Sequence, residues 1–354
     1  MSPAGPDLTL PTPLAVLIVL ACIGIGVFLS RAHARRVRRQ TRRRLHHLQG
    51  VIGRFREQRA SVIELRRAIR AAGEGPFWTA IEAVSLKLTR REWLRLSRAL
   101  ERDPYSAAER RALLDDSPWR RALAARRLSL LHSVASRRAL RRALACGPEM
   151  VTLAAAISLG RYRDRPALHW VLNHPNALVH RSAPALLALL KAFGSGALPT
   201  LTLALERGVG SSRLERAVVE IVGEARHRPA RAALERRLSS GDLELRVAAA
   251  RALGRLEAVE CASSLLAALK DPAWPVRAQA ARSLGLIRAP IATSALAARL
   301  TDASWWVRRH AAYALLELGD EGRAALRRVR EGSPDPYARE MAEEALESRP
   351  RGAA

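Results

Sequence analysis

Residues 271–287 read DPAWPVRAQAARSLGLI, and closely similar stretches lie on both sides of them. Before them, residues 242–256 read DLELRVAAARALGRL, and after them residues 302–318 read DASWWVRRHAAYALLEL. The repeat step is 31 residues, and it is kept by Arg246, Arg277 and Arg308, by Leu253, Leu284 and Leu315, and by Ala250, Ala281 and Ala312. A step of this length with helical periodicity is typical of a solenoid built from paired helices.

The repeat extends in both directions from these three stretches. One more step reaches Arg339 in DPYAREMAEEAL, which covers residues 335–346. Upstream, Val222 and Gly223 keep the register, with Glu215 at the arginine position. Weaker copies continue back to Ser117, so we predict seven or eight units, the first few approximate and the last incomplete.

Each predicted unit has a physical logic that follows from its residues. The Asp of each stretch can start a turn and cap the next helix. The paired alanines allow close helix packing, and Gly254 or Gly285 is expected to stop the first helix. No unit can bury its apolar stripe alone, so the units must stack around a shared core. The expected fold class is therefore all-α.

The two patterns, D…(W)VR..AA..LG.L and the return helix A..L...L, resemble the short HEAT repeats first named for phycobilin lyase subunits. The resemblance implies a right-handed α-solenoid of paired antiparallel helices with a concave protein-binding face. Some relatives are enzymes, and deoxyhypusine hydroxylase holds two irons with paired His-Glu dipeptides. Here His310 precedes Ala311, and the chain contains no His-Glu dipeptide.

Nothing else in the sequence indicates catalysis. Cys22, Cys146 and Cys261 lie far apart, so neither a zinc site nor a disulfide framework is expected. We find no Walker loop, GxSxG or HExxH motif. We therefore expect no catalytic residue, metal, cofactor or small-molecule substrate. An enzyme or enzyme subunit related to the HEAT-containing lyases and hydroxylases is the alternative.

An apolar segment near the N-terminus predicts a membrane anchor. Residues 14–29 read LAVLIVLACIGIGVFL without a charge, and residues 13–30 are long enough for a short transmembrane helix. A cleaved signal peptide is the alternative, but the basic charge follows the apolar segment instead of preceding it. Eight arginines make up this flank: Arg31, Arg35, Arg36, Arg38, Arg39, Arg42, Arg43 and Arg44. They predict a single-pass protein of the bacterial inner membrane, with residues 1–12 translocated and the rest cytoplasmic.

The net charge of +27 and the pI near 11.6 are compatible with nucleic acid or an anionic membrane as partner. Only Lys87, Lys191 and Lys270 are lysines, so the arginine bias also reflects the codon composition of a GC-rich, bacterial genome. Because the densest arginine cluster adjoins the apolar segment, we expect it to set topology and to contact anionic lipids. Binding of nucleic acid is the weaker alternative.

The remaining segments follow from the apolar spacing. Residues 31–72 are expected to form one basic, amphipathic juxtamembrane helix, either packed on the domain or dimerised as a short coiled coil. Residues 77–116 are expected to form an N-terminal helical cap, residues 117–347 the HEAT-like repeats, and residues 348–354 a disordered tail.

The repeats also supply the candidate binding residues. The repeated arginines either form a structural ladder between units or face an acidic partner. Tryptophans at the turns of adjacent units either pack between repeats or anchor an interface, since aromatic and Arg side chains are frequent hot spots. The candidates for protein binding are Trp274, Arg277, Trp305, Trp306, Arg308 and Arg339. We expect a membrane-anchored scaffold or adaptor that binds a protein on the cytoplasmic side.

Overall fold

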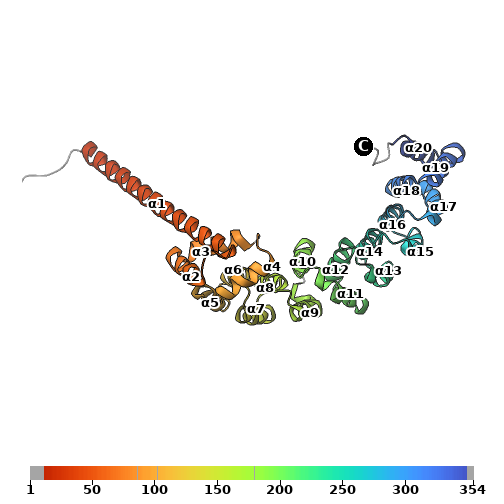
Figure 1. The fold of residues 1–354 in the computed structure, drawn as a ribbon. Helices are drawn as coiled ribbons and strands as arrows, with labels where there is room; N and C mark the ends of the chain where they lie inside the picture. Colours follow the sequence, from red (N-terminus) through yellow and green to blue (C-terminus); the bar gives the residue numbers. More distant parts are fainter. Residues whose placement is uncertain (1–11, 86, 102, 179, 349–354) are drawn as a thin grey trace, which may run out of the picture. The chain divides into compact units, whose positions relative to one another are not determined.

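The computed structural model describes residues 12–85, 87–101, 103–178 and 180–348, and every regular element in them is a helix (Figure 1). The prediction of an all-α solenoid is confirmed for these residues. The predicted translocated N-terminus (1–12) and C-terminal tail (348–354) lie almost wholly outside them. The chain divides into two compact units: residues 1–109 with 130–133, and residues 110–129 with 134–354.

The first unit contains α1 (Thr12–Arg56), α2 (Val62–Ala72), α3 (Glu74–Ser85), α4 (Arg90–Ala99) and most of α5 (Pro104–Ala112). The second unit contains α6 (Pro118–Leu128), α7 (Val134–Cys146), α8 (Glu149–Arg161), α9 (Arg165–Asn173), α10 (Ala183–Ala192), α11 (Leu198–Arg207), α12 (Ser212–Glu224), α13 (Arg231–Arg237), α14 (Leu243–Arg255), α15 (Ala262–Ala268), α16 (Trp274–Leu286), α17 (Thr293–Ala298), α18 (Trp305–Glu317), α19 (Asp320–Gly332) and α20 (Pro336–Glu347). Short 3₁₀ helices connect several of them: η1 (Pro175–Leu178), η2 (Ser195–Ala197), η3 (Arg228–Ala230), η4 (Val259–Cys261), η5 (Pro290–Ala292) and η6 (Arg299–Thr301).

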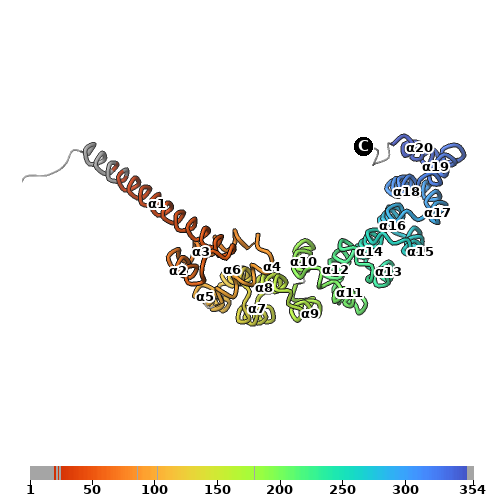
Figure 2. The backbone as a smooth tube through the Cα atoms, viewed as in Figure 1, coloured from red at the N-terminus to blue at the C-terminus, as the bar shows by residue number. Residues whose placement is uncertain are grey.

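The helix α1 is continuous from Thr12 to Arg56 (Figure 2). Six apolar side chains in its N-terminal part are exposed: Leu20, Ile23, Ile25, Val27, Phe28 and Leu29. The eight flanking arginines are exposed as well. At its other end, Leu48, Ile52 and Phe55 are buried in the core of the first unit, together with Leu65 and Ile69 of α2. The apolar stripe therefore packs within its own domain, and the coiled-coil alternative has no support in this unit.

The prediction of one helix over residues 31–72 is wrong. The chain leaves the helix after Arg56, and Gln58 adopts a left-handed conformation with φ of 64°. Ser61 then caps a new helix, because its side chain accepts a hydrogen bond from the Glu64 amide at 3.1 Å. The end at Ala72 was predicted correctly, and Gly73, with φ of 86°, supplies the helix stop.

Residues 77–116, predicted as a helical cap, contain α3, α4 and α5, and the boundary between the units falls inside α5. The first unit also takes in residues 130–133. There the Trp93 indole donates to the Leu130 carbonyl at 2.7 Å, and the His132 amide donates to the Ser97 hydroxyl at 2.8 Å. The capping role itself stays a prediction.

The second unit is a two-layer stack of helices. The first helices of the repeats pack against one another in a row: α6, α8, α10, α12, α14, α16, α18 and α20. The second helices form another layer along one side of that row (Figure 1): α7, α9, α11, α13, α15, α17 and α19. Seven helix pairs and an eighth first helix confirm the predicted number of units, with their first helix beginning at Pro118.

The glycines near the ends of the first helices were assigned the wrong role. Gly254 and Gly285 lie inside α14 and α16 and do not stop them. A Cβ on Gly254 would lie 2.5 Å from the Ser283 hydroxyl, and one on Gly285 would lie 2.8 Å from Ala314 Cα. These glycines therefore allow adjacent first helices to approach closely.

The actual turn lies three residues further on, where the backbone adopts a left-handed conformation. This position is occupied by Arg163, Gly194, Arg226, Glu257, Arg288 and Gly319, all with positive φ. Most of these residues are not glycine, so the stacked repeats impose a strained turn on side chains that disfavour it. Sequence reasoning could not find this turn, because its residue type varies.

In the described part of the chain, no single helix is both long enough and apolar enough to cross a membrane. The pair Ala183–Ala192 and Ser195–Arg207 passes that test jointly, but it is bent by 94°. Its leucines Leu186, Leu190, Leu201 and Leu205 are buried within the second unit. The apolar character of this helix pair is therefore explained by its leucines packing in the core of the second unit.

Candidate functional site

The candidate site is built on the loops that precede the first helices α14, α16, α18 and α20. The N-cap positions of these helices are Asp242, Ala273, Ser304 and Asp335, which follow one another at the 31-residue step. A second series, two residues earlier, consists of Ser240, Asp271, Asp302 and Ser333. Each member of this second series accepts a hydrogen bond from the amide two residues on, at 2.8 to 3.3 Å. The aspartates that the sequence places together thus occupy two different positions.

Four arginines, which we call the arginine ladder, hold these loops: Arg246, Arg277, Arg308 and Arg339. In each, the Nη1 atom donates to two carbonyls of the loop before its own helix. The shorter of these bonds measures 2.8 to 2.9 Å, with Ser240, Asp271, Asp302 and Ser333 as acceptors. The ladder therefore fixes the backbone at the start of each first helix.

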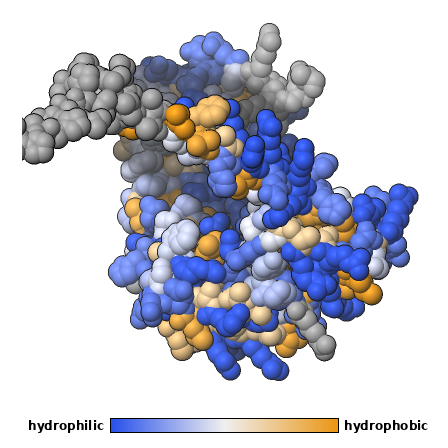
Figure 3. Space-filling model, turned by 90° about the vertical axis from the view of Figure 1, so that its left-hand side faces the viewer, coloured by the Kyte–Doolittle hydropathy of each residue, from blue (hydrophilic) through white to orange (hydrophobic). Residues whose placement is uncertain are grey.

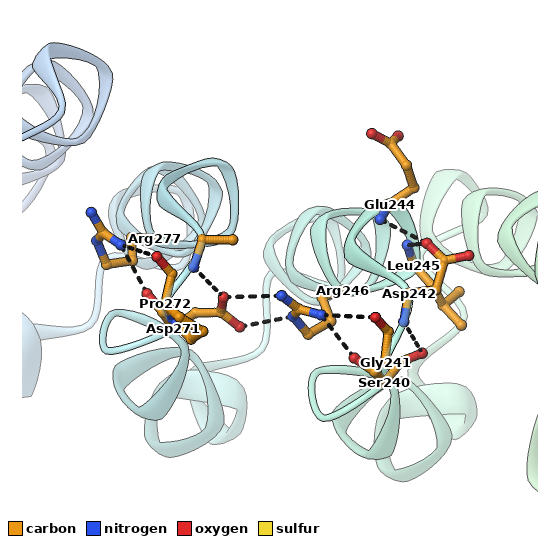
Figure 4. A network of polar contacts seen from close by, with 10 residues as sticks. Ser240, Gly241, Asp242, Glu244, Leu245, Arg246, Asp271, Pro272 and Arg277 are labelled. Carbon is orange, nitrogen blue, oxygen red and sulfur yellow. Dashed lines mark hydrogen bonds and ion pairs between the residues drawn. The ribbon is translucent and has the colours of Figure 1, made fainter.

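Two rungs of the ladder also join one repeat to the next (Figure 4). Arg246 donates to both carboxylate oxygens of Asp271, at 2.9 and 3.2 Å. Arg277 makes the same pair of bonds with Asp302, both at 2.8 Å. The side chains of these two arginines are only 14% and 15% exposed. Among the two readings of the ladder, the structural one holds for Arg246 and Arg277.

The electrostatics of the Arg277–Asp302 pair agree with its geometry. The hydrogen bond to Asp302 raises the pKa of Arg277. Burial by itself raises the pKa of Asp302, but the hydrogen bonds from Arg277 and Ser304 and the charges of Arg277 and Arg299 outweigh it, so the pKa lies below its usual value. Both groups are charged at neutral pH.

The ladder changes at its two ends. Upstream, Glu215 occupies the arginine position and pairs with Arg237 at 2.6 Å. Downstream, Ser333 occupies the position of Asp271 and Asp302, so Arg308 has no carboxylate to bridge to. The Nε atom of Arg308 is buried without a hydrogen bond in the described structure. Its guanidinium lies 5.3 Å from the centre of the Tyr337 ring.

A group of large aromatic side chains lies at the beginning of the same helices, and we call it the aromatic edge: Trp274, Trp305, Trp306 and Tyr337. Their exposed fractions are 45%, 43%, 51% and 63%. Trp305 and Trp306 meet edge to face, with ring centres 4.9 Å apart. The three tryptophans therefore lie at the surface, and none of them is fully buried between repeats.

Charged neighbours surround the aromatic edge. The Arg309 guanidinium lies 5.2 Å from the centre of the Trp305 ring, and 4.9 Å from that of Tyr313. Its Nη1 atom also donates to Glu344 at 2.8 Å. Cation–π contacts of this kind hold aromatic rings in place on a surface.

Tyr337 and Arg309 were missed from the sequence. The register contains a clue to the first, because Trp306 and Tyr337 are 31 residues apart, as are Trp274 and Trp305. Arg339, which was selected, is exposed and bonds only to its own loop in the described structure.

The structure offers no metal site in the residues it describes. No group of three or more His, Cys, Asp or Glu side chains there lies close enough together to hold an ion. A surface groove of about 690 Å³ in the second unit lies between η5 and α17 on one side and α19 on the other. It is lined by Ile291, Thr293, Ala297, Arg328 and Val329, among others.

Comparison with known proteins places part of the chain in a class. Residues 262–347, from α15 to α20, match the family model of HEAT repeats. No curated protein matches the chain. Three similar solved structures, described next, have TM-scores of 0.29 to 0.41.

The identities and coverages of these three solved structures are as follows. YibA of E. coli is 18% identical, with 77% of this chain and 97% of that chain covered, at a TM-score of 0.41. Human deoxyhypusine hydroxylase in complex with glycerol is 22% identical, with 68% of this chain and 94% of that chain covered, at a TM-score of 0.29. Kap121p bound to Ste12p is 14% identical, with 85% of this chain and 45% of that chain covered, at a TM-score of 0.34.

Proposed function

We propose that this chain is a HEAT-repeat protein that binds another protein through the aromatic edge, and that binding, not catalysis, is its activity. The observation that carries the proposal is the exposure of Trp274, Trp305, Trp306 and Tyr337 on three consecutive first helices. Soluble surfaces expose such groups of aromatic rings rarely, and Trp and Tyr are the residues that most often dominate binding energy.

The ladder beneath the edge supports this proposal. Arg277 and Arg308 tie down the loops that lead into Trp274 and Trp305. Residues held in this way lose little conformational freedom when a partner binds, which favours affinity. A rigid stack with exposed aromatic anchors is suited to recognition of a protein surface.

We further propose that α1 anchors the chain in a bacterial inner membrane, with the two units on the cytoplasmic side. The uncharged run at residues 14–29, the exposed apolar side chains from Leu20 to Leu29 and the basic flank support this part of the proposal. The flanking arginines Arg31, Arg35 and Arg36 would lie nearest the lipid head groups. Each basic residue near an anionic surface contributes about 1 kcal/mol to the attraction.

The continuity of α1 adds a geometric consequence. A helix rises about 1.5 Å per residue, so the stretch from Arg31 to Arg44 extends about 20 Å. Since α1 does not bend before it packs into the first unit, this stretch continues the direction of the span. Under this proposal the basic segment holds the core of the first unit at a set distance from the membrane.

The protein-binding proposal is tested with a tag at the C-terminus of the full chain, expressed in its own host and extracted in detergent. Replacing Trp305 and Trp306 by Ala is expected to abolish co-purification of the partner, with the helical content unchanged. Trp119 is a matched control, because it is 67% exposed at the start of α6. Equal loss of the partner with Trp119→Ala, or retention with the double variant, would contradict the proposal.

Membrane anchoring is tested separately. The full chain should sediment with membranes and resist extraction by high salt and alkali, whereas a chain lacking residues 1–30 should not. Release of the full chain by high salt alone would contradict anchoring, because it would indicate a purely electrostatic association.

A further inference from the structure

One series of positions runs along the first helices α12, α14, α16, α18 and α20. It consists of Glu220, Arg251, Arg282, Tyr313 and Glu344, each 31 residues from the next. Adjacent first helices pack against each other, so neighbours in the series belong to adjacent helices. Figure 3 shows one face of the molecule, on which hydrophilic residues are in the majority and hydrophobic residues form small groups.

The two ends of the series are satisfied by internal contacts. Arg251 donates to Glu220 at 2.7 Å, and Arg255 donates to the other oxygen of the same carboxylate at 2.8 Å. At the opposite end, the Tyr313 hydroxyl donates to Glu344 at 3.3 Å, and Arg309 donates to the same oxygen at 2.8 Å. Both carboxylates of the series are thus already used.

The middle of the series is not balanced. Arg282 is exposed on α16, and no hydrogen bond or ion pair involves its side chain in the residues that the structure describes. The register explains why: the neighbouring positions of the series hold Arg251 and Tyr313, and neither supplies a carboxylate. A full positive charge therefore stands on the face of the helix row.

The surroundings of Arg282 include the aromatic edge. His310, on α18, is half-buried, and its ring lies 6.4 Å from that of Trp306. Burial lowers the pKa of His310, and the positive charges of Arg282 and Arg309 lower it further. His310 therefore supplies no negative charge to Arg282 in either protonation state. His310 lies near both Arg282 and Trp306, so it links the charged side chain to the aromatic edge.

We propose that Arg282 binds a carboxylate of the protein partner, so that the partner contributes an acidic segment whose apolar side chains contact Trp305 and Trp306. The inference rests on the proposed function and names the chemistry of its partner. Charge complementarity carries it, because the only unbalanced charge in this series is positive.

A nucleic acid is the other anionic macromolecule to consider. The helix α20, which ends the same row, carries three exposed glutamates that form no ion pair in the described residues, Glu340, Glu343 and Glu347. A phosphate backbone carries a charge at every nucleotide and would be repelled by several of these groups, whereas a peptide can place one carboxylate at one arginine. The distribution of charge therefore favours a protein.

The test is selection from a display library of random 12-residue peptides on the full chain in detergent. Peptides enriched on the unaltered chain are expected to combine Asp or Glu with aromatic or aliphatic residues. For a synthetic copy of the most enriched peptide, Arg282→Glu is expected to weaken binding about tenfold or more, since a charge at an interface governs complementarity. Arg327→Glu is the matched control, because Arg327 is exposed on α19, in the other helix layer. It should change the affinity less than twofold.

The outcomes separate the two proposals. Enriched peptides that depend on Trp305 and Trp306 but lack acidic residues, or that bind the Arg282→Glu variant equally well, would overturn this inference alone. No enrichment, or enrichment unaffected by Trp305→Ala with Trp306→Ala, would overturn the proposed function and the inference with it. Salt-sensitive binding of a random single-stranded RNA that is lost in Arg282→Glu would assign the arginine to nucleic acid instead.

Discussion

The guanidinium of Arg277 donates to both carboxylate oxygens of Asp302, at 2.8 Å each, from one repeat to the next. The Asp302 side chain is 3% exposed and that of Arg277 is 15% exposed. The pair therefore joins α16 to the loop before α18, and Trp305 begins α18 three residues after Asp302.

Removing this arginine should destabilise the repeats. Arg277→Ala leaves the buried Asp302 carboxylate with only the longer ion pair to Arg299, at 3.6 Å, and we expect a loss of about 2–4 kcal/mol in the free energy of unfolding. Arg339→Ala, which removes an exposed rung without a carboxylate, should cost less than about 1 kcal/mol. Urea titrations of the full chain in detergent, followed by Trp fluorescence, would measure both. Equal effects of the two variants would show that the bridge to Asp302 has no special weight.

The incomplete rung can be completed. Ser333 occupies the position that holds Asp271 and Asp302 in the preceding repeats, and the Asp335 amide already donates to its hydroxyl at 3.3 Å. Ser333→Asp should keep that bond and give Arg308 a carboxylate, which stabilises the chain by about 1 kcal/mol. Ser333→Asn lacks the charge and serves as the control. A decrease in stability with Asp would contradict the assignment of this position to the ladder.

The stability that Asp302 contributes should depend on pH. Its pKa lies below 3.8 in the folded chain, so folding favours its ionised form. The contribution is complete above the unfolded value near 3.8 and is lost as the pH falls through the lowered folded value. Asp302→Asn should therefore be most destabilising at pH 7, and the difference from the unaltered chain should shrink below pH 3.8. A difference that is the same at pH 7 and at acidic pH would contradict the ion pair.

The close approach of first helices can be tested at Gly254. A Cβ there would lie 2.7 Å from the Ser283 Cβ, so Gly254→Ala should cost about 1–3 kcal/mol through overpacking. Gly241→Ala is the control, because its Cβ would have no neighbour within 4 Å. If both substitutions left the stability unchanged, Gly254 would have no packing role, and the space between α14 and α16 would be larger than described.

Sequence periodicity predicted the repeats because each unit must bury the same apolar positions, and the 31-residue step is visible in residues such as Leu253, Leu284 and Leu315. Asp242 and Asp271 look equivalent as the Asp before a helix, but they are 29 residues apart and do not keep the 31-residue step. Both accept a hydrogen bond from the amide two residues on. Only the structure shows where each helix begins: Asp242 is the N-cap of α14, whereas Asp271 lies two residues before the N-cap of α16.

The choice of candidate site residues, which stays a prediction, has a similar limit. The selected tryptophans are exposed, as an interface requires, but Arg277 is committed to Asp302 and is not free for a partner. Arg282 was not selected, because its lack of a carboxylate depends on which residues occupy the neighbouring positions of other helices. Charge balance across a stack is a property of the fold, and a single repeat does not contain it.

The central claim is that a protein partner binds at Trp305 and Trp306. The most direct measurement is the dissociation constant of the co-purified partner for the full chain, for the variant with both tryptophans replaced by Ala, and for Trp119→Ala. We predict a loss of affinity of at least about 3 kcal/mol for the double variant, more than a hundredfold, and no change for Trp119→Ala. Equal affinity of all three proteins would contradict the account.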